Sequence, residues 1–251
     1  MKNNSTSWSS VAPWYDEYLE TSADSYQAKV IAPNLLRMLE LKKGEAVLDV
    51  GCGQGYFSRL LAEAGAAVTG IDISEELITC AKEKGGTARY FAAPAHDTKL
   101  KAYSFDTTLI VLALENIKNI DQTFAEIARV LKKEGRVVLV MLHPAFRIPQ
   151  FSDWGFDTKK NLQYRRVDKY LSEAAIEISQ NPFKGTKEAK TVTYHRSLQW
   201  YMKVFKKHGF SITAMEEWIS HKKSAPGIRQ EAEDRARKEF PMFLALEIGK
   251  K

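Results

Sequence analysis

An apolar run enters a glycine-rich turn in the stretch Val47-Leu48-Asp49-Val50-Gly51-Cys52-Gly53-Gln54-Gly55-Tyr56-Phe57. Glycines at alternate positions permit turns that other residues resist, and their missing Cβ atoms let backbone N–H groups approach a ligand closely. At the carboxyl end of a strand in a parallel sheet, such a loop usually holds a nucleotide-type cofactor. A plain strand–turn–helix corner is the alternative, but three glycines after an acidic residue favour the binding site.

The residues around this loop alternate between strand-like and helix-like patterns. Strand-like runs occur at 46–50, 67–71, 89–92, 106–113 and 136–142, with helical segments between them at 56–64, 74–84 and 121–132. This alternation is typical of an α/β fold with a parallel sheet and crossover helices. Several strands are almost continuously apolar, which indicates that helices cover both faces. Two more strand candidates follow near the C-terminus, at 210–219 and 240–248.

The chain divides into four predicted regions. They are an N-terminal helical lid segment (1–45), a cofactor-binding core (46–143), a cap or substrate insertion (144–195) and the C-terminal part of the sheet (196–251). The insertion loses the strand–helix rhythm and carries 8 aromatic residues in the 51 positions 144–194, about 16% against 11% for the whole chain. Aromatic-rich insertions at a sheet edge commonly form pocket walls. An accessory hairpin with a small core of its own is the alternative.

Composition and charge are those of an ordinary globular protein. The 251 residues are 44% hydrophobic and 27% charged, with a net charge of +6. The basic residues are spread among acidic ones, which argues against a nucleic-acid partner. No apolar run is long enough for a membrane span, and no secretory signal is visible. Cys52 and Cys80 have neither metal-binding nor redox spacing, so we expect no metal site and a cytoplasmic location.

Two acidic residues accompany the glycine loop. Asp72 ends the second predicted strand, where an acid in doubly wound nucleotide sites accepts hydrogen bonds from both ribose hydroxyls. A helix N-terminal acid is the alternative for this residue. Asp49 lies at the end of an otherwise apolar strand, and it either braces the loop by accepting N–H groups or contacts the ligand directly. The dinucleotide spacing Gly-x-Gly-x-x-Gly is missed by one residue, because its third glycine would fall at Tyr56.

The pattern Asp49-x-Gly51-x-Gly53-x-Gly55, taken together with Asp72, resembles the class I S-adenosylmethionine-dependent methyltransferases. The resemblance covers about residues 35–143 and includes Ser104-Phe105-Asp106 and the segment 128–136. It is closest to the small-molecule group of the ubiquinone- and menaquinone-biosynthesis type, methyltransferase type 11. It implies a doubly wound, seven-stranded, mostly parallel sheet of the Rossmann-like methyltransferase fold, with an inserted aromatic-rich cap. It also implies S-adenosylmethionine as the methyl donor and S-adenosylhomocysteine as the product.

The resemblance implies a set of cofactor-binding residues along one edge of the sheet. They are Asp49, Gly51, Cys52, Gly53, Asp72, Ile73, Ala95, His96 and Val111. In this family the glycine loop lies along the methionine part and the ribose, and the acid at Asp72 binds the ribose diol. One position departs from the family pattern, since Pro94 stands where an acid often binds the adenine amine. Adenine recognition is therefore expected from the backbone near Ala95, or from His96 or Asp97.

Three residues are candidates for catalytic roles: His143, Glu115 and His195. His143 follows the fifth predicted strand, at the edge where ligands bind, and is the first candidate for a general base. Glu115 belongs to a Glu-Asn pair where relatives often show two histidines. It either orients a substrate or accepts a proton, or it is a surface helix-cap acid. His195 is a second candidate base, and for both histidines a hydrogen-bonded structural role is the alternative.

The expected reaction is in-line transfer of a methyl group to a small, apolar or aromatic acceptor. Such a transfer depends on positioning and exclusion of water, so we expect few catalytic residues and many pocket residues. The acceptor is expected to be enclosed by the cap and by Trp14, Tyr15, Tyr18, Trp200 and Tyr201. Two alternatives stay open: an RNA or other nucleic-acid methyltransferase, and a non-catalytic cofactor-binding module. The identity of the acceptor, the methylated atom and the oligomeric state do not follow from the sequence.

Overall fold

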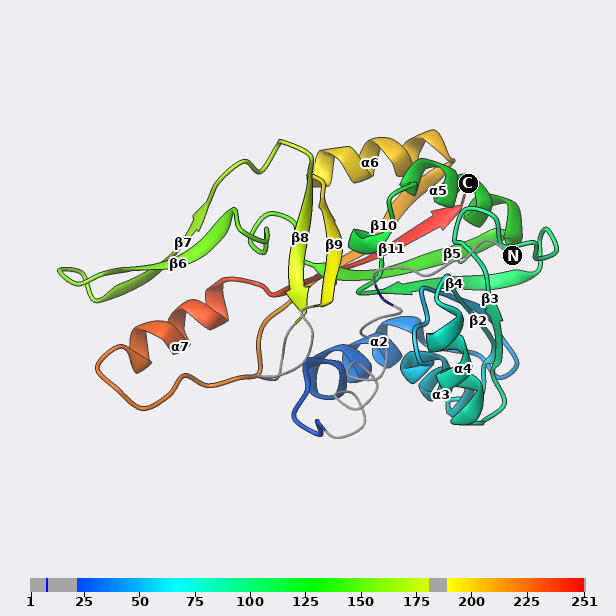
Figure 1. The fold of residues 1–251 in the computed structure, drawn as a ribbon, viewed down its shortest axis with the longest axis horizontal. Coiled ribbons are helices and arrows are strands. Elements are labelled where there is room, and N and C mark those ends of the chain that lie inside the picture. Colours follow the sequence, from blue (N-terminus) through cyan, green and yellow to red (C-terminus); the bar gives the residue numbers. More distant parts are fainter. Residues whose placement is uncertain (1–7, 9–21, 181–188, 251) are drawn as a thin grey trace.

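The computed structural model describes Trp8, residues 22–180 and residues 189–250. Within these residues, seven strands form one sheet in the order β10-β11-β5-β4-β1-β2-β3. Figure 1 shows this sheet between two layers of helices, one above it and one below. The predicted doubly wound α/β fold with a mostly parallel sheet is therefore confirmed. Trp14, Tyr15 and Tyr18, expected in the lid, lie outside the described residues.

The parallel part of the sheet has its centre at β1. Its strands are β1 (Ala46–Val50), β2 (Ala67–Asp72), β3 (Arg89–Ala92), β4 (Phe105–Val111) and β5 (Leu131–Leu142). β11 (Phe243–Lys250) runs antiparallel between β5 and β10 (Phe210–Trp218). The chain winds from β1 to β3 in one direction and then continues with β4 on the other side of β1. At such a switch point the loops that follow neighbouring strands run in opposite directions. This leaves a crevice at the carboxyl ends of the strands.

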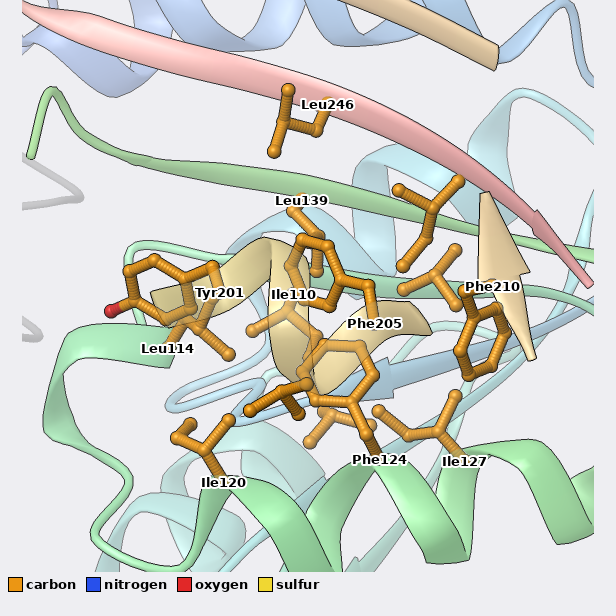
Figure 2. Packing of buried hydrophobic residues seen from close by; sticks show 14 of the residues in the cluster. Ile110, Leu114, Ile120, Phe124, Ile127, Leu139, Tyr201, Phe205, Phe210 and Leu246 are labelled. Atoms are coloured by element: carbon orange, nitrogen blue, oxygen red, sulfur yellow. The ribbon is translucent and has the colours of Figure 1, made fainter. Parts of the chain in front are cut away.

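Two apolar clusters fix the helices to the two faces of the sheet. One face carries α5 (Ile120–Val130) and α6 (Leu198–Lys207), whose buried side chains are shown in Figure 2. In this cluster the rings of Phe124 and Phe205 lie with their centroids 4.8 Å apart. The other face carries η2 (Gln27–Ile31), α2 (Ala32–Leu39), α3 (Tyr56–Glu63) and α4 (Glu75–Glu83). Burial on both faces explains why the central strands are continuously apolar.

The region 144–195 forms two hairpins. β6 (Ser152–Asp157) pairs with β7 (Leu162–Val167), and β8 (Ala174–Gln180) pairs with β9 (Ala189–His195). β7 packs against α7 (Gln230–Glu239), away from the sheet in Figure 1. β9 instead contacts η3 (Leu114–Asn116), a short 3-10 turn after β4. The second hairpin therefore reaches the sheet edge at which the crevice opens.

The boundary between α5 and β5 differs from the expectation. The helix predicted to extend to Lys132 ends at Val130, and β5 begins at Leu131 instead of Arg136. Leu131 has an extended backbone (ψ 141°) and pairs with Phe105 of β4. Pairing with a neighbouring strand, which a local pattern does not show, therefore ends the helix early.

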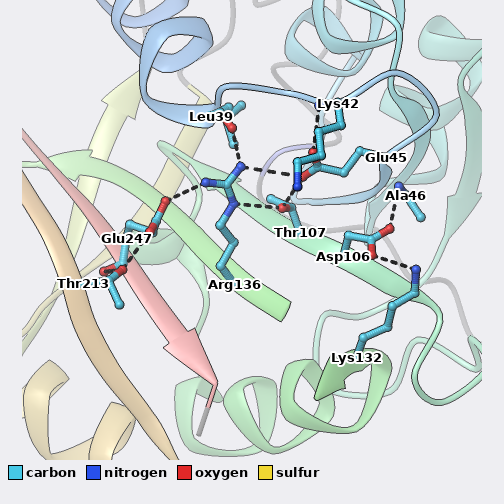
Figure 3. Close-up of polar contacts among 10 residues, drawn as sticks. All are labelled: Leu39, Lys42, Glu45, Ala46, Asp106, Thr107, Lys132, Arg136, Thr213 and Glu247. Carbon is cyan, nitrogen blue, oxygen red and sulfur yellow. Dashed lines mark hydrogen bonds and ion pairs between the residues drawn. The ribbon is translucent and has the colours of Figure 1, made fainter. Parts of the chain in front are cut away.

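Arg136 of β5 links the sheet to α2 and is drawn in Figure 3. Its guanidinium donates to Glu247 Oε2 of β11 at 2.8 Å and to Thr107 Oγ1 of β4 at 3.2 Å. It also donates to the carbonyl oxygen of Leu39, and the Glu45 carboxylate lies 3.7 Å away. The Arg136 side chain is 26% exposed, so these contacts are only partly screened by water.

Arg136→Ala is expected to lower the free energy of unfolding by about 2–4 kcal/mol, because the partly buried carboxylates lose their cation. Lys132→Ala is the matched control. Its ion pair with Asp106 is 2.7 Å long but at least 40% exposed on both sides, and such pairs contribute about 0–1 kcal/mol. Urea denaturation followed by circular dichroism measures both values. Equal losses in the two variants would contradict the role assigned to Arg136.

Candidate cofactor site

The loop after β1 has a backbone shape that requires glycine. Gly51, Gly53 and Gly55 have φ angles of 72°, 55° and 81°, in the left-handed region. A Cβ atom on Gly51 would lie 2.5 Å from the Cβ atom of Ala113, which follows β4. A Cβ atom on Gly55 would lie 2.6 Å from the hydroxyl of Tyr90 in β3. The three glycines therefore allow the turn and the close approach of its neighbours.

The Asp72 carboxylate joins this loop to the start of α4. Its Oδ2 accepts the N–H of Gly53 at 3.0 Å, and its Oδ1 accepts the N–H of Ser74 at 2.9 Å. Burial raises the pKa of Asp72, and these N–H groups together with that of Ile73 oppose the rise. Ser74 is the N-cap of α4, since its Oγ accepts the N–H of Leu77 at 3.2 Å. The carboxylate is thus held in place by backbone groups and has lone pairs left for a ligand.

A cavity of about 300 Å³ opens beside this loop, at the carboxyl ends of β1, β2, β3 and β4. This volume is at the lower end of the range for small-molecule sites. Eight of the nine predicted cofactor-binding residues line the cavity: Gly51, Cys52, Gly53, Asp72, Ile73, Ala95, His96 and Val111. The switch point therefore brings together residues from four separate parts of the chain.

Asp49, the ninth predicted residue, does not line the cavity. Its side chain is buried beneath the loop, and its Oδ2 accepts the hydroxyl of Ser58 in α3 at 2.6 Å. Burial raises the pKa of Asp49 to about 7; the Ser58 hydrogen bond opposes the rise, and the charge of Asp72 adds to it. Of the two roles considered for Asp49, the geometry favours bracing of the loop over direct contact with the ligand.

The chain after β3 forms another wall of the cavity. Pro94, Ala95 and His96 line it, whereas Asp97 does not and forms an exposed ion pair with Lys99 at 2.8 Å. On the wall formed after β2, Ile73 is 45% exposed although its side chain is large and apolar. Such exposure is expected where a ligand covers the side chain.

The chain after β4 supplies lining residues that were not predicted. Leu112 takes a left-handed backbone conformation (φ 52°), which is strained for leucine and is a feature of functional sites. The Asn116 side chain donates to the Leu112 carbonyl at 3.2 Å and accepts the Thr193 hydroxyl of β9 at 3.1 Å. Leu112, Asn116 and Ile117 all line the cavity. In the Glu-Asn pair the sequence pattern singles out the acid, but Asn116 is the residue that lines the cavity.

Glu115 stands one residue before Asn116 and does not itself line the cavity. Its Oε2 is buried and has no hydrogen-bond partner among the described residues. Burial raises the pKa of Glu115 to about 7, and the N–H groups of Glu115 and Leu142 oppose the rise. Burial also raises the pKa of Tyr201 to about 12, with a contribution from the charge of Glu115. Figure 2 shows the Tyr201 hydroxyl pointing out of the apolar cluster.

His143 is buried directly after β5 and is not among the residues that line the cavity. Its Nε2 lies 2.8 Å from Glu217 Oε1 of β10, and its Nδ1 accepts the N–H of Ala145 at 3.2 Å. Because Nδ1 accepts, the proton is on Nε2 and is donated to Glu217. Burial lowers the pKa of His143, and Glu217 opposes that shift. Both ring nitrogens are thus engaged in contacts that fix the end of β5.

His195 lies at the end of β9, with Nε2 2.8 Å from the carbonyl oxygen of Tyr170. It lines a second cavity of about 180 Å³, together with Glu173, Tyr194 and Arg196 among others. The structure therefore places the three candidates for catalytic roles at three different positions. None of them is among the residues that line the cofactor cavity.

The described ranges offer neither a metal-binding cluster nor a membrane-spanning helix. Residues 22–180 and 189–250, with Trp8, contain no group of three or more His, Cys, Asp or Glu side chains arranged to hold a metal ion. Over the same residues, no helix has the length and apolar character needed to cross a membrane.

Known proteins similar to this chain share the part that carries the loop. A methyltransferase-domain family matches residues 48–139, and a protein-L-isoaspartate(D-aspartate) O-methyltransferase family matches residues 4–89. A demethylmenaquinone methyltransferase of Tropheryma whipplei is 40% identical, over 41% of this chain and 44% of the relative. A ubiquinone biosynthesis O-methyltransferase of Aromatoleum aromaticum is 32% identical, over 51% of this chain and 57% of the relative. The chain thus spans about half the length of these curated relatives.

One solved structure is similar over almost the whole chain. The crystal structure of an S-adenosylmethionine-dependent methyltransferase from Mesorhizobium loti is 26% identical, with a TM-score of 0.68. The likeness covers 87% of this chain and 96% of that one. The order of the seven strands, the glycine loop and the acid that ends β2 agree with these matches. In the order of its strands and in the motif of its glycine loop, the chain is similar to the class I S-adenosylmethionine-dependent methyltransferases.

Proposed function

We propose that this protein transfers the methyl group of S-adenosylmethionine to a small acceptor with an apolar or aromatic body. The observation that carries the proposal is that the Asp72 carboxylate and the glycine loop meet at one cavity of about 300 Å³. The relatives named for demethylmenaquinone methylation and ubiquinone biosynthesis support a small-molecule acceptor.

The residues that line the cavity fit the nucleoside part of this cofactor. Each oxygen of Asp72 accepts one backbone N–H and has a further lone pair for a ribose hydroxyl. Gly51 and Gly53 bring the backbone next to the ligand with no Cβ atom between them. Ile73 offers an exposed apolar surface, and we assign the adenine to His96 and the backbone of Ala95, both of which line the cavity.

The chemistry of the transfer places few demands on protein side chains. When bound, S-adenosylmethionine supplies an electrophilic methyl group on a positively charged sulfur. The chain has to align the acceptor with that methyl group and to exclude water. Val111, Leu112 and Ile117 give the β4 side of the cavity an apolar surface suited to both tasks. The same surface favours an acceptor with an apolar or aromatic body.

Of the three candidates for catalytic roles, the geometry favours Glu115. Its buried Oε2 has no hydrogen-bond partner among the described residues, whereas His143 and His195 are engaged by Glu217 and by the Tyr170 carbonyl. With a pKa of about 7, Glu115 can hold or accept a proton near neutral pH. We assign it the role of orienting the acceptor and accepting its proton; because Glu115 does not itself line the cavity, this role requires the acceptor to reach past its neighbour Asn116, which does.

Asp72→Asn is expected to weaken S-adenosylhomocysteine binding at least about 10-fold, because the charged acceptor for the ribose hydroxyls is lost. Asp49→Asn is the matched control: it replaces the neighbouring buried carboxyl beneath the same loop and retains an acceptor for Ser58. We expect that control to bind within about 2-fold of wild type. Isothermal titration calorimetry measures both affinities. Equal losses in the two variants would show that Asp72 is not the specific ribose ligand.

Glu115→Gln is expected to change stability in a pH-dependent way. Below about pH 4.5 the carboxyl is neutral in both the folded and the unfolded chain. Between about pH 4.5 and 7 the unfolded chain releases the proton and the folded chain keeps it, so the wild type loses stability as the pH rises. Glutamine cannot ionise, and the variant should therefore be about 2–3 kcal/mol more stable than wild type at pH 8, but equally stable at pH 4.

Urea denaturation at pH 4 and pH 8 tests this difference. Glu126→Gln is the control of opposite sign, because the hydrogen bond from Arg129 lowers the pKa of Glu126 to about 2 and its charge is stabilising at pH 8. Methyl transfer provides a second measurement. The rise of kcat through pH 7 should disappear in Glu115→Gln, and a profile like that of the wild type would refute its role as proton acceptor.

Methyl transfer itself is tested with methyl-labelled S-adenosylmethionine and a panel of small phenols, hydroquinones, carboxylic acids and amines. We expect labelled product from at least one acceptor with an aromatic or apolar body, and none with Asp72→Asn. Short single-stranded RNA is included in the panel. Label in the RNA alone would favour a nucleic-acid methyltransferase, and cofactor binding without any product would favour a non-catalytic module.

A further inference from the structure

Three arginines gather outside the cofactor cavity, where the first hairpin meets α7. Arg147 follows β5, Arg165 lies in β7 and Arg237 lies in α7. The guanidinium carbons of Arg147 and Arg165 lie 5.4 Å and 5.0 Å from the ring centre of Trp154 in β6. Trp154 is held in turn by Phe240, with the rings edge to face at 5.4 Å. All three arginines and Trp154 are partly exposed, so a small ion can reach them.

Among the described residues, no carboxylate forms a close ion pair with this arginine cluster. Within the described part of the chain, none of the three guanidinium groups forms an ion pair within the 4.0 Å limit that defines one. Two acids act on the cluster from beyond ion-pair distance. Asp153 acts on Arg165, and its Oδ1 accepts the N–H of Trp154 at 2.7 Å. Asp234 acts on Arg237, and its Oδ1 accepts the N–H of Ser224 at 2.7 Å.

Arg147 is the member of the cluster without a structural explanation. Arg165 donates to the Phe146 carbonyl and Arg237 donates to the Ser224 hydroxyl, so both fix local structure. The Nε of Arg147 is buried and has no hydrogen-bond partner among the described residues. The pKa of Arg147 is lowered to about 10, mainly by burial and also by the charges of Arg165 and Arg237, while Tyr26 opposes the shift. The protein thus keeps a cation where burial and two neighbouring arginines oppose it.

The arginine cluster lies at the same edge of the sheet as the cofactor cavity. The N–H of Arg147 donates to the carbonyl of His143 at 2.8 Å, which keeps Arg147 close to the carboxyl end of β5. β5 is the direct neighbour of β4, whose end lines the cavity. Adjacent strands lie about 5 Å apart. An acceptor bound over the ends of β4 and β5 can therefore extend from the cavity toward Arg147.

We propose that Arg147, Arg165 and Arg237 form an anion-binding site, and that the methyl acceptor carries the anionic group as a carboxylate or a phosphate. Guanidinium groups match both anions through paired N–H donors, and Trp154 offers a flat apolar surface beside them. The bound anion supplies the close ion pair that the described residues do not give these arginines. The identity of the ligand as acceptor rests on the proposed methyl transfer, whereas the existence of the anion site does not.

Thermal unfolding in the presence of anions tests the site independently of catalysis. Sodium phosphate and sodium benzoate, each at 20 mM and at constant ionic strength with sodium chloride, are the two probes. A rise in Tm of about 2–4 °C with at least one of them is expected for wild type. The rise should be absent in Arg147→Gln and in Arg237→Gln. It should persist in Arg89→Gln, which removes an exposed arginine on β3, and in Asp72→Asn.

The comparison of variants decides the outcome. A response to phosphate alone assigns a phosphate group to the acceptor, and a response to benzoate assigns a carboxylate. Equal rises in wild type and Arg147→Gln, or no rise in wild type, would overturn the site. A short RNA could instead raise Tm where neither small anion does. If that rise were lost in Arg147→Gln, it would overturn the assignment of a small-molecule acceptor.

Kinetics connect the site to the acceptor once a turned-over acceptor is known. For a pair of acceptors that differ only in a carboxylate or phosphate group, Arg147→Gln should raise KM at least 10-fold for the charged member alone. Affinity for S-adenosylhomocysteine should not change in this variant. Two separate results distinguish the two failures: unchanged cofactor affinity in Asp72→Asn would contradict the proposed function, whereas a missing anion response in wild type would contradict the anion site. An unchanged KM for the charged acceptor in Arg147→Gln would overturn the link between the anion site and the methyl acceptor.

Discussion

The two backbone hydrogen bonds to the Asp72 carboxylate are the interaction on which the cofactor edge depends. They tie Gly53 in the loop after β1 to Ser74 at the start of α4, so two crossover connections share one charged group. A buried carboxylate is costly unless N–H groups solvate it, and here the same N–H groups also fix its direction. The glycine loop, the N-cap of α4 and the cavity wall therefore form one unit, and a ligand that hydrogen-bonds to Asp72 meets a group already in place.

The ionisable groups around this unit divide by environment. Asp49 and Glu115 are carboxyls whose pKa is raised to about 7, mainly by burial, yet Asp49 is satisfied by Ser58 whereas Oε2 of Glu115 has no partner among the described residues. His143 follows β5 at the edge where ligands bind, but both of its ring nitrogens are engaged in hydrogen bonds. A methyl transfer that relies on alignment is compatible with so few available groups, since most of the barrier reduction then comes from positioning and exclusion of water.

Much of the fold and of the cofactor wall could be predicted because both follow from local patterns. Alternating strand and helix signals place the ends of β1, β2 and β4 at one edge, and eight of nine proposed cofactor residues line the cavity there. The left-handed Leu112 and the Asn116–Thr193 hydrogen bond were not predictable, because one is a strain imposed by packing and the other joins residues 77 positions apart. The early end of α5 was missed for a similar reason, since Leu131 pairs with β4.

The sequence by itself determined the glycine loop, Asp72 and the order of strands and helices, because backbone conformation and burial periodicity are properties of short segments. Only the tertiary structure decided which polar groups remain without partners. It directed His143 toward Glu217, placed Asp49 beneath the loop, and brought Arg147 together with arginines from β7 and α7. Such contacts depend on how distant segments pack. The sequence of a segment therefore does not show whether a charged side chain will have a counter-charge beside it in the folded protein.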